Sequence, residues 1–96
     1  MSTIIVLPLP ETVEQVTIQP LPLYKVILHN DMIHFVREVV DALLKSVPVT
    51  AQEAEQITLT AHNEGRAVVI ECNKEAAEYY QERLGSYGLT VTIEPA

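Results

Sequence analysis

The side chains in this sequence that could carry out covalent or metal chemistry are few. The chain has one cysteine, Cys72, and three histidines, His29, His34 and His62. Protein metal sites usually show close, regular spacings such as H-x-x-x-H or C-x-x-C, and neither spacing occurs here. Cys72 ends an apolar run, where a small buried residue is expected rather than a nucleophile. We therefore predict no metal, no other cofactor and no catalytic residue.

The glycines and a row of acidic residues bear on what the chain could bind. Phosphate-binding loops need several glycines close together, and the three glycines are too scattered for that: Gly65, Gly85 and Gly88. Three acidic side chains recur at helical spacing, namely Glu75, Glu78 and Glu82. Such a row is either a solvated helix face or a surface that docks a basic partner. Residue types alone thus predict a binding domain that is not an enzyme.

The composition narrows the class of protein. With 96 residues, the chain has room for one small domain. Its 13 acidic and 6 basic residues give a net charge of −7, which repels nucleic acid phosphates and argues against a nucleic acid partner. The hydrophobic fraction of 48% is typical of a folded domain. A single cysteine excludes a disulfide scaffold.

The sequence also predicts a cytoplasmic protein without a membrane partner. Its apolar runs are far shorter than the roughly 18 residues that span a bilayer. No Lys or Arg precedes Lys25, so the charged start of a signal peptide is missing. The lone cysteine suits a reducing compartment.

A change in composition near residue 22 predicts two segments. Residues 1–22 contain four of the six prolines but only two charged residues. Proline lacks a backbone donor and has a fixed φ, so this segment suits neither a helix interior nor a central strand. We predict an extended tail over 1–22 and a folded domain over 23–96. The tail is either mobile or lies with its apolar residues against the domain or a partner.

The domain begins with a predicted strand and two helices. Residues 24–29 are a short apolar, β-branched run typical of a strand. Apolar residues over 35–47 recur at the spacing of one helix face, and the helix must end before Pro48. Thr50 and Glu53 have the spacing of a capping box that opens the next helix. That helix ends at Gly65, a residue suited to a left-handed C-terminal cap.

The second half continues as strand, helix and strand. Residues 66–72 contain a buried-strand run, and Asn73 is a favourable N-cap for a helix that ends near Gly85. Residues 89–94 alternate between apolar and polar, as in a strand with one wet face. The order is therefore β-α-α-β-α-β. Three short strands must bury one face against helices, which predicts an α+β two-layer sandwich with a three-stranded antiparallel sheet.

Several ordered motifs resemble the ClpS adaptor family of Clp proteases. The run YKVILHND over residues 24–31 is similar to the family's first strand and pocket entrance. The run AHNEGRAV over 61–68, the helix start EAAE over 75–78 and the ending TIE over 92–94 follow in the family's order. The resemblance covers most of residues 23–96 and implies a ClpS-like fold.

The resemblance also implies a function. ClpS-like proteins are adaptors without enzymatic activity that bind N-degrons, which are substrates beginning with a bulky apolar residue such as Leu, Phe, Tyr or Trp. They deliver these substrates to a Clp-family AAA+ unfoldase and its peptidase. An N-terminal extension, where residues 1–22 lie here, affects that delivery in the family.

The family's site residues can be carried over position by position. The resemblance implies that Asn30, Asp31 and His62 bind the substrate's α-amino group, where charge-assisted hydrogen bonds are strong. It places the hydrophobic pocket at Met32, Thr58, Ala61 and Leu89. Docking of the unfoldase would use Glu75 and Glu78. From residue type alone, Asn30 or Asp31 could equally cap the first helix, and His62 could simply complement a helix dipole.

The sequence departs from the family around the pocket. The loop between Asp31 and Phe35 is shorter and has no second acidic residue or Thr-Pro pair. Thr58 stands where the family has a specificity-setting methionine, which predicts a wider and more polar pocket. Tyr80 replaces a docking lysine and could pack on the core instead.

These departures leave three hypotheses open. The first is a divergent adaptor that keeps N-degron binding. The second is a ClpS-like protein–protein interaction module that has lost the pocket. The third is a small enzyme or metal protein. A peptide with a blocked amino terminus separates the first two, and metal in the purified protein would indicate the third.

Overall fold

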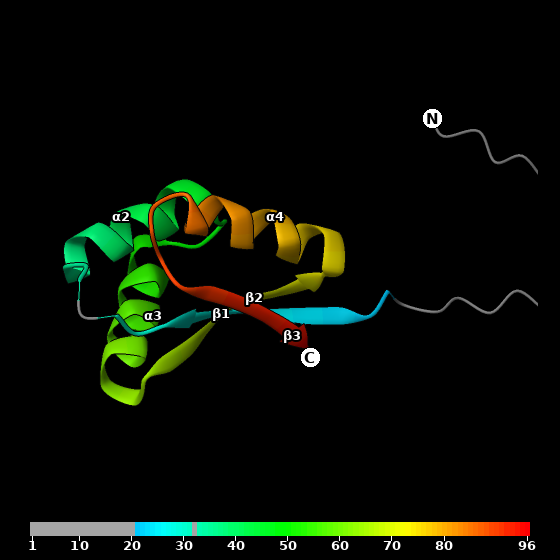
Figure 1. Cartoon of the computed structure of the whole chain (residues 1–96), viewed down its shortest axis with the longest axis horizontal. Helices are drawn as coiled ribbons and strands as arrows, with labels where there is room; N and C mark the ends of the chain where they lie inside the picture. Colours follow the sequence, from blue (N-terminus) through cyan, green and yellow to red (C-terminus); the bar gives the residue numbers. More distant parts are fainter. Residues whose placement is uncertain (1–20, 32) are drawn as a thin grey trace, which may run out of the picture.

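The computed structural model describes residues 21–31 and 33–96, and its six elements follow the predicted order β-α-α-β-α-β (Figure 1). The elements are β1 (Leu23–His29), α2 (Val36–Ser46), α3 (Ala51–Glu64), β2 (Arg66–Asn73), α4 (Lys74–Gly85) and β3 (Val91–Pro95). Of the predicted tail over residues 1–22, residues 1–20 lie outside the described residues.

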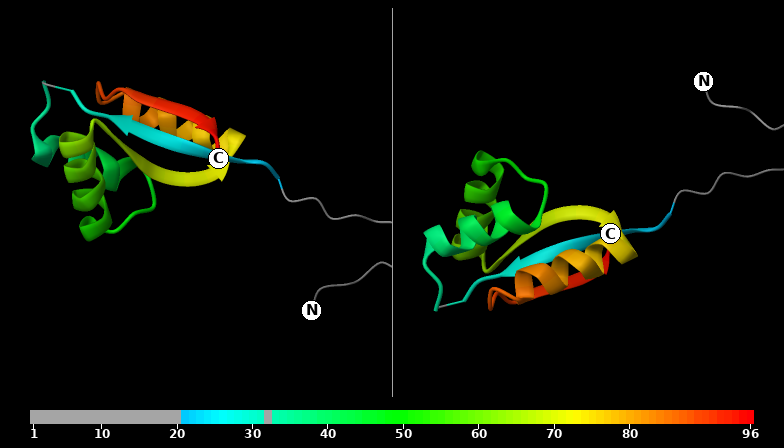
Figure 2. Two further views of the ribbon diagram at one scale, coloured as in Figure 1. Left: turned by 90° about the horizontal axis from the view of Figure 1, so that it is seen from below. Right: turned by 90° about the horizontal axis from the view of Figure 1, so that it is seen from above.

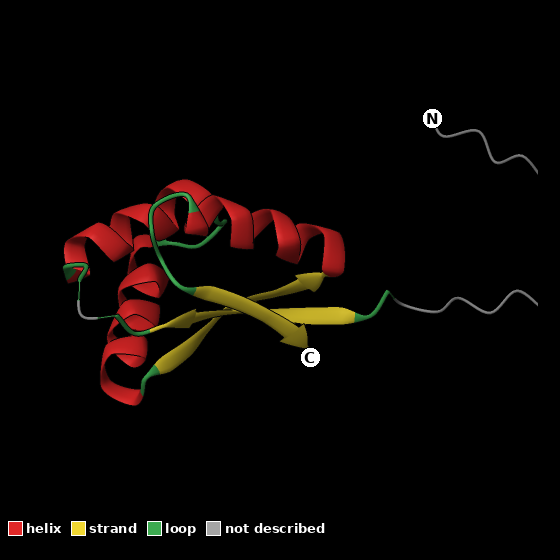
Figure 3. Cartoon of the chain, in the orientation of Figure 1, coloured by secondary structure: helices red, strands yellow, loops and turns green. Residues whose placement is uncertain are grey.

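The three strands form one antiparallel sheet with β1 in the centre, in the order β2-β1-β3 (Figure 3). Val26 pairs with Ile70 on one side and with Ile93 on the other. The register of β2 shifts after this pair, leaving Val69 as the extra residue of a bulge. Because of the bulge, both Val69 and Ile70 contact the core beneath the helices.

The helices form the second layer, as predicted for an α+β sandwich. In Figure 1, α2 and α4 lie above the sheet and α3 stands across its left end. Figure 2 shows α4 in front of the sheet from above and behind it from below. The core between the layers contains fully buried Val26, Leu43 and Leu84, and burying each such side chain contributes about 1.5–3 kcal/mol.

One buried residue lies on the other face of the sheet. Ile27 is fully buried but does not belong to the core beneath the helices. Arg66 and Glu94 form an ion pair of 3.2 Å, although β1 separates their strands. Arg66 is in register with His29 and Glu94 with Lys25, so the pair crosses the sheet diagonally over Ile27. The ion pair therefore lies on the same face of the sheet as Ile27.

The predicted helix caps are present. Thr50 Oγ1 accepts from the Glu53 N–H while the Glu53 carboxylate accepts from the Thr50 N–H. The side chain of Asn73 accepts from the Ala76 N–H at 2.8 Å. Gly65 ends α3 with φ of 93°, a conformation that a side chain disfavours.

One predicted boundary is wrong. The expected strand over residues 89–94 begins only at Val91. Leu89 is 6% exposed and packs in the core ahead of the strand. The reason is Gly88, whose φ of 84° turns the chain between α4 and β3, so that pairing with β1 starts two residues later.

Within residues 21–31 and 33–96, no helix has both the length and the apolar character required to cross a bilayer.

Candidate functional site

A hollow lies where β1 ends, between the loop that follows this strand, the start of α2, the last turns of α3 and the residue Leu89. It contains about 350 Å³ of empty space, part of which is open to solvent. Six of the seven residues predicted for substrate binding line it, namely Asn30, Asp31, Thr58, Ala61, His62 and Leu89. The seventh, Met32, lies outside the described residues.

A backbone hydrogen bond brings the end of β1, which precedes Asn30, close to the end of α3, which carries His62. The Asn30 N–H donates to the Gly65 carbonyl at 2.9 Å. This bond fixes the residue after β1 beside the residue that caps α3. Asn30 and His62 consequently line the same hollow, and both are exposed to solvent. Their side chains are accessible to a ligand that enters from outside.

The floor of the hollow is apolar and buried. Leu28 is 2% exposed, Ala61 3% and Leu89 6%. Thr58 is 4% exposed, and its hydroxyl donates to the Ala54 carbonyl at 2.8 Å within α3. That internal bond satisfies the hydroxyl donor and leaves the methyl group for apolar contacts. The pocket is therefore less polar than the presence of a threonine alone suggests.

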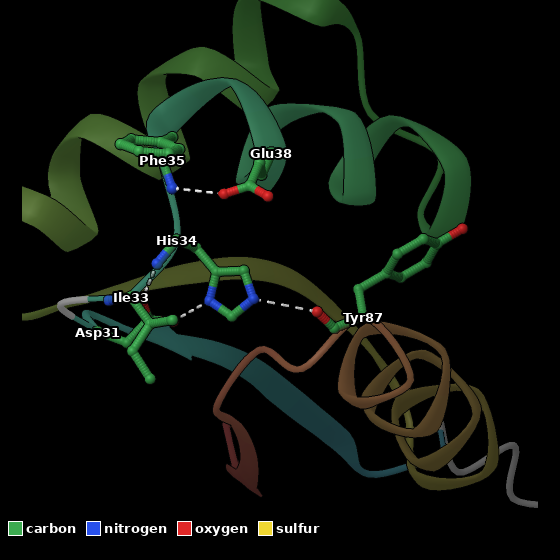
Figure 4. Close-up of polar contacts among 6 residues, drawn as sticks. All are labelled: Asp31, Ile33, His34, Phe35, Glu38 and Tyr87. Atoms are coloured by element: carbon green, nitrogen blue, oxygen red, sulfur yellow. Dashed lines mark hydrogen bonds and ion pairs between the residues drawn. The ribbon is translucent and has the colours of Figure 1, made fainter.

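The carboxylate of Asp31 organises the short loop before α2. Its Oδ1 accepts from the backbone N–H groups of Ile33 and His34 at 2.9 and 2.8 Å, and its Oδ2 pairs with His34 Nδ1 at 2.9 Å (Figure 4). The N-cap of α2 is Phe35, whose N–H donates to Glu38 Oε1. The alternative in which Asn30 or Asp31 caps this helix is thus wrong. Asp31 instead closes the turn ahead of the helix.

His34 lies at the centre of this loop. Its Nε2 is 3.2 Å from the Tyr87 carbonyl oxygen in the turn after α4, so both ring nitrogens face acceptors. Only the imidazolium form can donate to both. The sequence predicts no role for His34 beyond that of a possible metal ligand. Its spacing of three residues from Asp31 is the signal that could have revealed the pair.

The pairing shifts both pKa values. The hydrogen bond to Asp31 raises the pKa of His34, against a smaller effect of burial. Partial burial alone would raise the pKa of Asp31, but hydrogen bonds from the His34 and Ile33 backbone and the His34 ring together lower it. The ordinary pKa values are 3.8 for Asp31 and 6.5 for His34, and the pair therefore stabilises the fold fully when the pH lies between them. This stabilisation is lost as pH falls through the lowered Asp31 pKa or rises through the raised His34 pKa.

The predicted docking residues lie elsewhere. Glu75 and Glu78 are exposed on the first half of α4, which starts where β2 ends, whereas the hollow lies where β2 begins. Tyr80 is partly buried and packs against the core, as the sequence suggested. The acidic residues thus form a surface separate from the hollow.

Two observations concern the residues that could carry covalent or metal chemistry. Burial raises the pKa of the Cys72 thiol, which disfavours the reactive thiolate. In the part of the chain that the structure describes, no group of three or more His, Cys, Asp or Glu residues is arranged to hold a metal ion.

The close contact between His34 and the turn after α4 can be tested by measuring protein stability. Gly88 has φ of 84°, and a Cβ there would lie 3.3 Å from His34 Nε2. Gly88→Ala should therefore lower the free energy of unfolding by about 1–2 kcal/mol, measured by urea denaturation near pH 6. The matched control is Gly85→Ala in α4, where a Cβ would meet nothing within 4 Å. Equal effects of the two changes would contradict the assigned turn.

Comparison with known proteins identifies relatives of the whole folded region. Residues 19–92 match the family model described as ATP-dependent Clp protease adaptor protein ClpS. An ATP-dependent Clp protease adapter protein ClpS from Gloeobacter violaceus is 47% identical over 88 residues, covering 88% of this chain and 95% of the relative. A chloroplastic Clp protease adapter protein from Chlamydomonas reinhardtii is 45% identical over 75 residues, covering 77% of this chain and 46% of the relative.

A solved structure shows the same fold. ClpS2 from Agrobacterium tumefaciens bound to L-phenylalaninamide superposes with a TM-score of 0.75 at 30% sequence identity, covering 78% of this chain and 98% of that one. Its ligand combines a free α-amino group with an aromatic side chain.

Proposed function

This chain belongs to the ClpS family of ATP-dependent Clp protease adaptors, and from this premise we propose that it binds N-degrons through the hollow beside β1 and delivers them to a Clp AAA+ unfoldase. The observation that carries the proposal is the grouping of Asn30, Asp31 and His62 around an apolar, buried floor. The phenylalaninamide bound by the Agrobacterium relative has the chemistry that such a hollow suits.

The chemistry of an α-amino group explains the choice of side chains. The group is a cation with several N–H donors, so it needs acceptors that approach from different directions. Asn30 and Asp31 come from the end of β1, and His62 comes from the last turn of α3. Each charge-assisted hydrogen bond contributes about 1.5–3 kcal/mol.

The apolar floor would bind the first side chain of the substrate. Its burial adds roughly 1.5–3 kcal/mol. Summed with the polar contacts and reduced by the cost of association, this corresponds to an affinity in the micromolar range. Thr58 and Ala61 are small, so the floor suits large side chains such as Phe or Trp.

The alternative function, an interaction module without an N-degron pocket, has less support because the hollow and its polar rim are both present. We infer that the protein acts as an adaptor without catalysis of its own. The cytoplasmic location stays a prediction, because its relatives include bacterial and chloroplastic proteins. A role for the tail in delivery also stays a prediction, since residues 1–20 lie outside the described residues.

Peptide binding tests the function directly. Fluorescence anisotropy with labelled peptides beginning Leu, Phe, Tyr or Trp should show micromolar binding that N-acetylation abolishes, because the acetyl group removes the cation. His62→Ala should weaken binding roughly tenfold. Asn63→Ala is the matched control, since this neighbouring exposed residue does not line the hollow. Equal binding of free and acetylated peptides would favour the alternative function.

A substitution at Thr58 tests how much space the floor of the hollow offers to the first side chain of the substrate. Thr58→Met introduces a longer side chain where the buried threonine meets the hollow. We expect anisotropy to show weaker binding of Phe and Trp peptides, by about tenfold, with Leu peptides less affected. Gln56→Met, on the exposed part of α3, should leave all affinities unchanged. A uniform change across the series would contradict a role in side-chain selection.

Docking of the unfoldase is proposed at Glu75 and Glu78. Their carboxylates are exposed and would pair with basic groups of the partner. The double change Glu75→Lys and Glu78→Lys should abolish complex formation with the purified unfoldase, measured by biolayer interferometry, while peptide binding stays intact. Glu55→Lys with Glu64→Lys is the control, because it makes the same charge change on exposed residues of α3. Similar losses in both variants would indicate a nonspecific charge effect.

A further inference from the structure

His34 connects two segments of the molecule beside the hollow, the loop after β1 and the turn after α4. Its ring pairs with Asp31 in the loop after β1, reaches the Tyr87 carbonyl in the turn after α4, and itself lines the hollow. Figure 4 shows the ring lying between these two partners. A single side chain thus spans the two segments on either side of the hollow's rim.

The surroundings of His34 hold its ring in this place. The side chains of His34 and Asp31 are only 19% and 18% exposed. Gly88 follows Tyr87, and the position of a Cβ there would lie 3.3 Å from His34 Nε2. A side chain at position 88 would crowd the imidazole, so glycine favours the close approach of the turn after α4. The close fit suggests that the ring is part of the built site and not a loose surface residue.

We propose that His34 is a positioning residue of the amino-group site: in its imidazolium form it holds the Asp31 carboxylate and the short loop in the arrangement that receives the ligand. The inference rests on the proposed function and deepens it. His34 acts through Asp31 and need not touch the ligand.

The protonation of His34 decides how many contacts it makes. A neutral imidazole has one N–H and can donate to Asp31 or to Tyr87, but not to both. The groups that act on the ring are the Asp31 carboxylate from its own loop, Glu38 from α2 and the Tyr87 carbonyl from the turn after α4. His29 from β1 and His62 from α3 line the same hollow. Ligand binding should therefore weaken when pH rises and the ring loses its second proton.

Substitutions of His34 separate its two hydrogen bonds. The amide nitrogen of His34→Asn can take the place of Nδ1 and keep the bond to Asp31. The amide nitrogen of His34→Gln can take the place of Nε2 and keep only the bond to Tyr87. We expect His34→Ala and His34→Gln to bind a Phe-initiated peptide roughly tenfold more weakly at about pH 6. His34→Asn, which like the neutral ring keeps only the bond to Asp31, should bind about threefold more weakly, and the original protein should lose a similar factor when its ring is neutral. Ile33→Ala, which shortens an 82% exposed side chain in the same loop, is the matched control.

The pH dependence of peptide affinity distinguishes a positioning role of His34 from a purely structural one. Affinities measured at about pH 6 and about pH 7.5 should fall more steeply with pH for the original protein than for His34→Asn, which cannot titrate. His29 and His62 are unchanged in both proteins, so the difference between the profiles reports on His34. Identical profiles, or unchanged affinity in His34→Ala, would overturn the proposal.

A binding-independent measurement distinguishes failure of this inference from failure of the proposed function. Amide hydrogen exchange should show that the Ile33 and His34 N–H groups, which donate to Asp31, exchange faster in His34→Ala. If the original protein binds no free-amine peptide, the proposed function fails and the exchange rates alone decide whether His34 holds Asp31. Unchanged exchange at both amides would show that His34 does not hold Asp31, whatever the result of the peptide-binding assay.

Discussion

The burial of β1 in the centre of the sheet is the constraint on which the rest of the structure depends. Val26, Ile27 and Leu28 are each at most 2% exposed, because β2 and β3 flank the strand and the helices cover one face. Slipping the strand by one residue would exchange its two faces. The register is therefore strongly specified, and with it the point where Asn30 and Asp31 leave the sheet beside the end of α3.

The short loop after β1 shows how a local change can be accommodated. It has few residues with which to hold a carboxylate in place, and three donors from Ile33 and His34 converge on Asp31 instead. The link from His34 to Tyr87 then ties the loop to the turn after α4. Local contacts thus hold Asp31, and one contact between distant segments holds the loop.

The hollow and the acidic face of α4 lie at opposite ends of β2. The proposed substrate site and the proposed docking site at Glu75 and Glu78 therefore do not overlap.

The sequence by itself determined the order of the elements, because proline, glycine and capping residues such as Thr50 and Asn73 act locally. It also indicated Asn30, Asp31 and His62 through resemblance to a family. Only the tertiary structure brings His34 to the Tyr87 carbonyl, because the two residues are 53 positions apart. The diagonal pair Arg66–Glu94 likewise depends on strand packing. Such contacts join residues far apart in the chain, and local patterns carry no information about them.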